Sequence, residues 1–423
     1  MEQHQLFRRD FILLVVGQII SLFGNAILRF ALPLYLLRQT GSAALFGAVT
    51  ACAFLPMVIF SFLGGGIADR VNKGKIMAVL DFSTALLTAA CGLFLGRMPL
   101  VPLMLGVLMA LYGIAGAYQP AVQASLPLLA TGEKLVQANA VVNMVSTLAG
   151  LLGPVIGGVL FGAFGLTPIL VVSTLCFLAS AGMELFLRIP YTRRQMTGGL
   201  LRTAGEDIRQ SRDFIRREKP VFLRVILLLA LFNMVLSAAL IVGLPVMVIQ
   251  CLGGSDAQLG LTQGAMGLGG LVGGGAAGGL ANRWQLRHSS SLLLACSGAV
   301  LVMGLALLPG VPAQIGYALL TAMSFCTMGV ATVFTVLLLS AVQGQTPPHL
   351  LGKIMALAMA VANCAQPVGQ ALYGLLFDGL AHHAWLVMAG AALASGIIAL
   401  AARPIFRILE EEVDRNPGGL TVP

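Results

Sequence analysis

The sequence predicts an all-α integral membrane protein with twelve transmembrane helices in two pseudo-symmetric six-helix bundles. Of its 423 residues, 58% are hydrophobic and only 10% are charged, and the mean hydropathy is +0.93. A soluble domain averages about 25% charged residues, so lipid must form much of the surroundings of this chain. The apolar stretches are continuous and do not alternate with polar residues, which favours spanning helices over a closed barrel.

Stretches long enough to cross a bilayer occur twelve times, since a spanning helix needs about 20 mostly apolar residues. They cover residues 11–37, 43–68, 75–96, 100–121, 138–163, 167–188, 221–250, 257–281, 289–308, 312–341, 353–378 and 384–403. Six of them lie in each half of the chain, which predicts two bundles.

Two landmarks recur at one spacing and indicate a duplication. Residues 65–70, Gly-Gly-Ile-Ala-Asp-Arg, recur at 278–283 as Gly-Gly-Leu-Ala-Asn-Arg, 213 positions later (278 minus 65). Pro154, within one apolar stretch, matches Pro367 within another at the same offset. Two similar membrane halves are typical of a secondary transporter, with its site between the halves near the bilayer midplane.

Positive charge is concentrated on one side of the predicted membrane. With both termini in the cytoplasm, Arg38 and Arg97 fall outside and Arg29 within a span, which leaves 22 of the 25 lysines and arginines inside (25 minus 3). Such an excess marks cytoplasmic loops. Anionic lipid on the cytoplasmic face accounts for the net charge of +9, so no nucleic-acid partner is expected. We expect a multi-pass protein of a bacterial inner membrane with both termini cytoplasmic.

The spans divide the chain into four parts. These are an N-terminal bundle over 1–190, a cytoplasmic linker over 191–220, a C-terminal bundle over 221–403 and a cytoplasmic tail over 404–423. Between Glu206 and Lys219 the linker places Ile208, Phe214 and Ile215 among charged residues. This pattern predicts an amphipathic helix on the cytoplasmic membrane surface, and a solvated linker is the alternative.

The loop after the second span, residues 65–75, is the strongest local signal. Glycine there lets a neighbouring helix approach closely, and Asp69 could accept hydrogen bonds at a helix N-terminus. The two basic side chains of the motif could pair with nearby carboxylates. We interpret the loop as a latch that joins two helices in one conformation, formed by Gly65, Asp69, Arg70 and Lys73. A plain basic turn is the alternative.

This loop resembles the signature of the major facilitator superfamily, which has a Gly, an Asp-Arg pair, another Gly and two basic residues. Asn72 stands where the second Gly is usual, which is a mild change because Asn tolerates left-handed conformations. Gly74 replaces a basic residue, for which Lys75 could compensate. In the second copy Asn282 replaces the acid, so we expect that latch to lack a charge partner.

The fifth predicted span combines glycine with proline, which removes a helix hydrogen bond and allows a bend. We predict helix kinks at Gly153, Pro154 and Gly157, and at Pro367 in the second copy. The pattern resembles the glycine-proline motif of antiporters in the superfamily, and a purely structural kink is the alternative. Three further segments, 17–42, 54–56 and 126–139, are similar to the drug-proton antiporter branch that includes macrolide exporters.

Arg29 lies inside the first span with no acid nearby in the sequence. A membrane arginine costs at least about 2.5–3.5 kcal/mol on insertion scales, so it usually faces a cavity or a partner. One interpretation is a cavity role in binding substrate or ion. The other is snorkelling outward, or pairing with Asp378 at the outer end of the eleventh span.

The resemblance implies proton coupling, for which drug-proton antiporters often use a membrane-embedded carboxylate. Asp81, near the cytoplasmic end of the third span, is our proton-carrier candidate, because a carboxyl group removed from water holds a proton more readily. A structural role beside Lys75 is an equal alternative. Glu184 lies one turn before Arg188, which predicts an ion pair near the inner face.

Polar side chains in lipid turn inward, so several uncharged ones are candidates for lining the substrate cavity. With Arg29 the candidates are Gln18, Asn25, Arg29, Gln119, Asn143, Asn233, Asn363 and Gln366. For any one of them, a hydrogen bond to a neighbouring helix is an equally good interpretation.

Together these patterns predict a secondary active transporter that works by alternating access and exports amphipathic drug-like or lipid-like small molecules, coupled to protons. One alternative is a transporter of an anionic solute or lipid headgroup anchored by Arg29, and another is a non-transporting membrane receptor or scaffold. We expect no enzyme activity, because no span pairs a histidine with a carboxylate. We also expect no cofactor and no metal, because no nucleotide-binding loop or metal-ligand spacing occurs. The chain is expected to act as a monomer.

Overall fold

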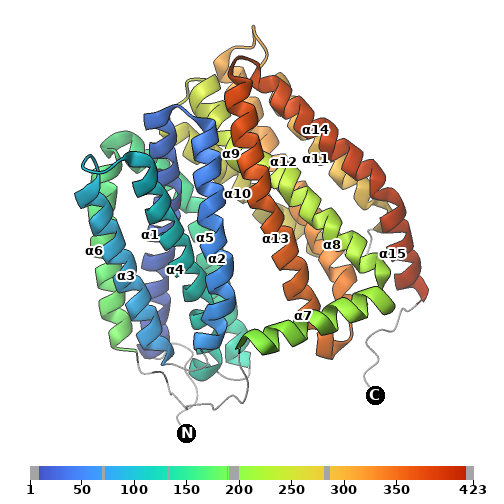
Figure 1. The fold of residues 1–423 in the computed structure, drawn as a ribbon, viewed down its shortest axis with the longest axis horizontal. Coiled ribbons are helices and arrows are strands. Elements are labelled where there is room, and N and C mark those ends of the chain that lie inside the picture. The colour runs from blue at the N-terminus through green and yellow to red at the C-terminus, as the bar shows by residue number, and fades with distance from the viewer. Residues whose placement is uncertain are drawn as a thin grey trace. The chain divides into compact units, whose positions relative to one another are not determined.

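The computed structural model describes residues 9–68, 72–130, 133–187, 189, 200–280 and 286–415. Their regular structure is helical throughout, with no strand in these ranges, which confirms the all-α prediction (Figure 1). Eleven helices of the described chain are long and apolar enough to cross a membrane. A twelfth, α10 (Asp256–Leu280), stands outside that set because its ten glycines lower its hydropathy.

The chain forms two compact units. The first contains Met1–Gly198 and Asp256–Gly260, and the second contains Gly199–Ser255 and Leu261–Pro423. Within the first unit, Arg38 forms a 2.8 Å ion pair with Asp256.

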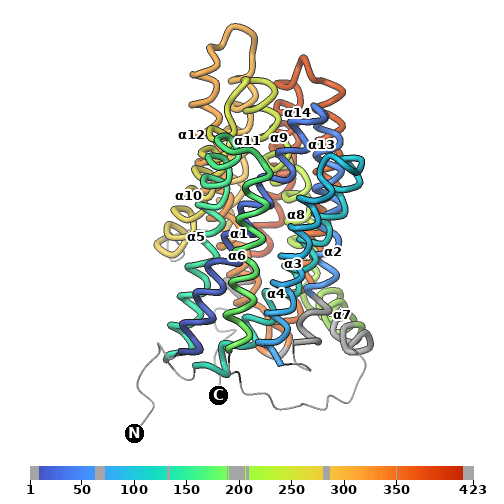
Figure 2. The backbone as a smooth tube through the Cα atoms, turned by 90° about the vertical axis from the view of Figure 1, so that its left-hand side faces the viewer, coloured from blue at the N-terminus to red at the C-terminus, as the bar shows by residue number. Residues whose placement is uncertain are grey.

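The first unit is a bundle of six long helices. They are α1 (Arg9–Thr40), α2 (Ala43–Ala68), α3 (Lys73–Phe94), α4 (Leu100–Leu129), α5 (Glu133–Phe164) and α6 (Leu166–Leu185). Helix α1 packs against both α5 and α6, and α3 packs against α6 and α4 (Figure 2). Four helices, α1, α3, α4 and α6, therefore enclose a common interior.

The second unit has a more broken helical path. Its elements are α7 (Leu200–Arg217), α8 (Pro220–Phe232), η1 (Asn233–Ser237), α9 (Ala238–Pro245), η2 (Val246–Cys251), α10 (Asp256–Leu280) from residue 261 onward, η3 (Leu286–His288), α11 (Ser289–Leu305), α12 (Ala313–Gly344), α13 (Pro348–Gly379), η4 (Ala381–His383), α14 (Ala384–Ala401) and α15 (Arg403–Arg415). The π-helical turns η1 and η2 join α8 and α9 into one apolar span over Pro220–Cys251.

The packing of the second unit repeats that of the first. Helix α11 packs against α14 and α12 as α3 packs against α6 and α4. Helix α13 packs against α8, η1 and α9 as α5 packs against α1. The duplication read from the sequence is therefore also a repeat of helix packing.

Glycines of the predicted kinks lie where two helices approach closely. A Cβ atom at Gly153 would collide with Ala26 of α1, and one at Gly157 would come within 3.1 Å of the Phe30 ring. Helices α5 and α13 each continue through their proline, Pro154 and Pro367 respectively. The glycines thus permit close packing of α5 on α1, while the kinks themselves stay predictions.

The linker contains the helix α7, of which the last turn packs on protein. Phe214 and Ile215 are buried, and the Phe214 ring lies 6.3 Å from the ring of Phe222 on α8. The sequence pattern predicts that these two side chains face the membrane surface. Contact with α8 removes these apolar side chains from water just as contact with lipid would. The same sequence pattern therefore fits both arrangements. The side chain of Ile208 lies outside the described part.

Candidate functional site

Two acidic side chains are buried in the interior of the first unit. Asp81 of α3 and Glu184 of α6, here called the acidic pair, are each only 1% exposed. The Ser21 hydroxyl of α1 donates a 2.8 Å hydrogen bond to Asp81 Oδ1. The Tyr118 hydroxyl of α4 donates a 2.6 Å hydrogen bond to Glu184 Oε1. Four helices thus each contribute one side chain to a single polar cluster.

Close contact between α1 and α6 positions Glu184. A Cβ atom at Gly17 would lie 3.5 Å from Ser180 Oγ and 3.6 Å from Glu184 Cγ, which are ordinary contact distances and show that both side chains of α6 lie against α1. The Ser180 hydroxyl donates a 3.1 Å hydrogen bond to the Gly17 carbonyl and also lies beside the Asp81 carboxyl group. Because Ser180 and Glu184 are four residues apart, they share one face of α6.

Each member of the acidic pair has one oxygen without a hydrogen-bond partner. Within the described residues, Asp81 Oδ2 and Glu184 Oε2 are buried and accept no hydrogen bond. Both amide atoms of Gln18, one turn before Ser21 on α1, are also buried without a partner there. Ser180, one turn before Glu184 on α6, also lies beside the Asp81 carboxyl group, so the two acids are neighbours. Two neighbouring carboxylates cannot both be ionised in such surroundings without a large cost.

Apolar side chains close the cluster on the side where α1 and α3 begin. The core there includes Phe11 and Leu14 of α1, Met77 of α3, Leu126 of α4 and Leu187 after α6. All five are buried. This layer excludes water from one end of the acidic pair, which makes its polar groups interact more strongly than they would in solvent.

The structure refines the expectations for the two acids. Asp81, predicted near the cytoplasmic end of its span with Lys75 as an alternative neighbour, lies inside the bundle and accepts a hydrogen bond from Ser21. For Glu184 the spacing predicts an ion pair with Arg188, which lies outside the described residues, and the partner seen is Tyr118. The sequence pattern therefore did not reveal the roles of Ser21, Tyr118 and Glu184. The available signal was an acid within an apolar span.

Polar residues also form a stripe along α1. Gln18, Ser21, Asn25 and Arg29 follow one another at intervals of three, four and four residues, which places them on one helix face. Asn25 Nδ2 donates a 2.9 Å hydrogen bond to the Ser21 carbonyl, and its Oδ1 is buried without a partner in the described part. The Arg29 guanidinium lies 4.1 Å from the centroid of the Tyr112 ring of α4, a cation–π contact.

The remaining cavity candidates lie in both units and in different surroundings. Gln119 of α4 is half-buried, and Asn143 of α5 is exposed. In the second unit, Asn233 of η1 accepts a 2.9 Å hydrogen bond from Ser237, and Asn363 and Gln366 of α13 are half-buried. Their common role in a substrate cavity stays a prediction.

The predicted latch is only partly described. Asp69 and Arg70 lie outside the described residues, Gly65 lies in α2, and Lys73 begins α3. Asn72 caps α3, and its side chain accepts a 3.3 Å hydrogen bond from the Lys75 backbone. Its φ of −60° and ψ of 118° are extended, so this position does not require the left-handed conformation of a glycine. The latch stays a prediction.

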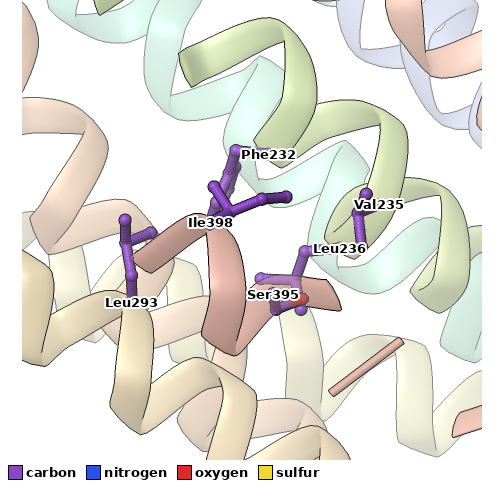
Figure 3. A pocket seen from close by; sticks show the side chains of 6 residues that line it. All are labelled: Phe232, Val235, Leu236, Leu293, Ser395 and Ile398. Atoms are coloured by element: carbon purple, nitrogen blue, oxygen red, sulfur yellow. The ribbon is translucent and has the colours of Figure 1, made fainter. Parts of the chain in front are cut away.

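The second unit has a small apolar pocket at the junction of α8, η1, α11 and α14. It is lined by Phe232, Val235, Leu236, Leu293, Ser395 and Ile398 (Figure 3). Its volume of about 10 Å³ is close to the minimum for one water molecule. The hydroxyl of Ser395 is buried there and has no hydrogen-bond partner among the described residues. No group of three or more potential metal ligands occurs in the described part of the chain.

A duplicated all-α membrane fold with a buried polar interior is typical of secondary transporters, which are not enzymes. The sequence model of the Major Facilitator Superfamily matches residues 14–370, and the chain belongs to that family. Its substrate is therefore a small molecule. The resemblance seen in the 65–75 loop is confirmed at the level of the superfamily.

Curated relatives include two kinds of bacterial transporter. The chain is 23% identical to Macrolide efflux protein A of Streptococcus pyogenes over 393 residues, which are 92% of this chain and 95% of the relative. It is 33% identical to Lysophospholipid transporter LplT of Salmonella paratyphi B, over 184 residues that cover 43% of this chain and 44% of the relative.

Solved structures confirm the fold. A bacterial homologue of the human lysosomal transporter Spinster, inward-facing and unoccupied, matches with a TM-score of 0.72 and 13% identity over 96% of this chain and 97% of its own. The nucleoside transporter NupG matches with a TM-score of 0.75 and 13% identity over 95% of this chain and 100% of its own. At this identity the likeness concerns the fold alone.

Proposed function

We propose that this protein is a secondary active exporter of amphipathic drug-like or lipid-like small molecules. The observation that carries this proposal is the end-to-end similarity to a macrolide efflux protein, which spans 92% of this chain and 95% of the relative. The partial similarity to a lysophospholipid transporter supports the same substrate class. Macrolides and lysophospholipids share little chemistry except a large apolar body joined to a polar group.

Composition supports an adaptable binding surface. The chain contains 18 methionines and 21 phenylalanines. Methionine repacks easily around different apolar shapes, and aromatic rings supply large contact areas. Such a surface suits ligands that differ in outline but share amphipathic character.

Transport is proposed to proceed by alternating access, in which one bundle rocks against the other around a central site. The latch at Gly65, Asp69, Arg70 and Lys73 would hold one conformation, and the helices that carry Pro154 and Pro367 would bend as it opens. The excess of cationic residues supports cytoplasmic termini in a bacterial inner membrane, with anionic lipid at the cytoplasmic face. The protein is proposed to act as a monomer.

Protons are the proposed coupling ion, and Asp81 is the proposed carrier. Its burial and its position within the α1, α3, α4 and α6 interior support this role. A carboxylate that gains a proton loses its charge, so its preferred surroundings change between the two states of a transport cycle.

The experiment uses purified protein in liposomes that contain a pH-sensitive dye. After a proton gradient is imposed, labelled erythromycin or lysophosphatidylethanolamine is added. We expect accumulation of the compound together with proton movement in the opposite direction, both absent from protein-free liposomes. Accumulation without proton movement would contradict proton coupling, and no movement of either amphipathic compound would contradict the substrate class.

A second candidate function is transport of an anionic solute or lipid headgroup anchored by Arg29. The buried Arg29 Nε has no hydrogen-bond partner in the described part of the chain, while the guanidinium stacks on Tyr112. Arginine holds phosphate through paired hydrogen bonds. If Arg29 binds the headgroup, Arg29→Ala should reduce lysophospholipid transport more than macrolide transport, and Arg97→Ala, at an exposed arginine, should affect neither. Equal loss for both substrates would contradict this anchor.

A further inference from the structure

Unpartnered polar atoms gather in one interior of the first unit. Among its described residues, all buried side-chain nitrogen and oxygen atoms without a hydrogen-bond partner belong to Gln18, Asn25, Arg29, Asp81 and Glu184. Buried polar groups normally have partners, because an unmade hydrogen bond costs free energy. A group of such atoms in one place therefore indicates a ligand that completes it. For two neighbouring carboxylates, the smallest such ligand is a proton.

We propose that Asp81 and Glu184 form one proton site, in which the two carboxyl groups together bind and release the coupling proton. This inference rests on the proposed proton-coupled export and deepens it by adding Glu184 as the second half of the site. Glu184 is as buried as Asp81 and presents an equivalent free oxygen. The sequence spacing assigned Glu184 only an ion pair with Arg188, and no part in proton binding.

The titratable groups that face the site come from three helices. They are Asp81 of α3, Tyr118 of α4 and Glu184 of α6. Helix α1 contributes only the uncharged Gln18 and Ser21, and the adjoining part of α5 is apolar. No cation of the described chain interacts with either carboxyl group. A proton is therefore the neutralising charge that this interior supports best.

The proposed step is a simple proton transfer. A proton from water binds to Asp81 Oδ2 or Glu184 Oε2, the two oxygens that accept no hydrogen bond, and converts one carboxylate into a carboxylic acid. The other acid of the pair stays ionised, so the pair then carries one negative charge instead of two. On the other side of the membrane the same proton returns to water, and the carboxylate is restored.

Proton binding is linked to α1 through Ser21. The Ser21 hydroxyl donates to Asp81 Oδ1, and a hydrogen bond to a charged oxygen is roughly twice as strong as one to a neutral oxygen. When the proton binds to Asp81, this hydrogen bond weakens and α1 is held less tightly to α3. The polar stripe of α1 carries Asn25 and Arg29, two of the predicted substrate contacts, so this loosening would reach the substrate region directly.

Infrared difference spectroscopy across a pH range tests the site without any substrate. Wild-type protein in lipid bilayers is compared with Asp81→Asn, Glu184→Gln and the control Asp378→Asn, which changes an exposed acid. We expect a protonated-carboxyl signal that both pair variants shift or remove and that the control leaves unchanged. A signal that is insensitive to Glu184→Gln, or no such signal in the wild type, would overturn the proposal.

Transport assays with labelled erythromycin then distinguish a loss of proton coupling from misfolding. Exchange of labelled for unlabelled substrate needs no net proton movement, whereas accumulation against a gradient does. We expect each pair variant to retain exchange and to lose gradient-driven accumulation, which also shows that it is folded. Wild-type accumulation by Glu184→Gln, with loss only in Asp81→Asn, would overturn a shared site. If the wild type itself shows no proton-driven accumulation, the proposed function fails, while the infrared result still decides whether the pair shares a proton.

Discussion

The interior of the first unit and the matching position of the second unit have opposite chemistry. Ser21, Asp81 and Glu184 of the first unit correspond to Val235, Leu293 and Ile398, since each pair lies within one residue of the 213-residue offset. These three apolar residues line the small pocket of the second unit. The matching helix junction thus holds two carboxyl groups in one copy, whereas in the other it holds apolar side chains and the hydroxyl of Ser395.

A serine hydroxyl is present at this helix junction in both units. Ser180, beside the acidic pair, corresponds within two residues to Ser395, which lies in the apolar pocket. In the first unit the hydroxyl donates to the Gly17 carbonyl, whereas in the second it has no partner among the described residues. The difference teaches that the helix packing does not need the acids, because the second unit forms the same junction without them. The acids are therefore better explained by function than by folding.

The largest effect is expected when the first unit is given the chemistry of the second. Asp81→Leu combined with Glu184→Ile should reduce proton-driven accumulation of labelled substrate to the level of protein-free liposomes. The free energy of unfolding should stay the same or rise by about 1–4 kcal/mol, because apolar residues often replace buried charged groups without loss. Transport and thermal unfolding are measured on the same preparation. If this double variant accumulates substrate as well as the wild type does, the two acids are not required for transport.

Placing an acid in the apolar pocket of the second unit should lower the stability of the protein. Leu293 is buried in α11, and Leu293→Asp would place a lone carboxyl group in an apolar pocket. A carboxyl group buried without a compensating partner costs free energy. We expect a marked fall in the thermal unfolding temperature. Leu293→Met is the control, since volume-conserving apolar changes usually cost less than about 1.5 kcal/mol. Equal stability of the two variants would show that this position is not as apolar as the structure indicates.

A smaller effect is expected from removing one hydrogen bond of the acidic site. Tyr118→Phe leaves Glu184 Oε1 without its donor, which should cost about 1–3 kcal/mol because a buried acceptor is left unpaired. Tyr112→Phe, the matched control, keeps the ring face beneath Arg29 and should change stability by less than about 0.5 kcal/mol. The thermal unfolding temperatures of Tyr118→Phe and Tyr112→Phe are measured and compared. Similar stability losses would contradict a specific role of the Tyr118 hydroxyl.

The smallest effect on stability is expected where the loop motif differs between the copies. Asp69→Asn makes the first loop like the second, which has Asn282 at the matching position. Turnover should slow because the latch loses its charge, while stability should change by no more than about 0.5 kcal/mol. Asp213→Asn, at an exposed acid of α7, is the control for turnover. Unchanged turnover in Asp69→Asn would refute a latch.

Much of the fold followed from the sequence. Continuous apolar stretches predicted the spanning helices, and the shared offset of residues 65–70 and Pro154 predicted the repeat that the packing shows. The loop motif predicted the superfamily, which the match over residues 14–370 confirms. These features depend on local composition and order along the chain, which a single sequence displays directly.

The candidate site was only partly predictable. Asp81 was a candidate because any acid in an apolar span is unusual, but its neighbours were not. Its bond to Ser21 joins residues 60 positions apart, and the Tyr118–Glu184 bond joins residues 66 positions apart. For Glu184 the nearby Arg188 was the obvious partner by spacing, because sequence proximity hides how a helix is rotated about its axis.

By itself, the sequence determined that this protein crosses a membrane as helices in two related halves, since lipid leaves a chain with this apolar pattern no other way to satisfy its backbone. Only the tertiary structure decided that Asp81 and Glu184 meet in one half while Leu293 and Ile398 line the matching pocket in the other. Helix rotation and neighbours in a membrane are set by side-chain packing across helices, and that information is distributed over the four segments that contain Ser21, Asp81, Tyr118 and Glu184.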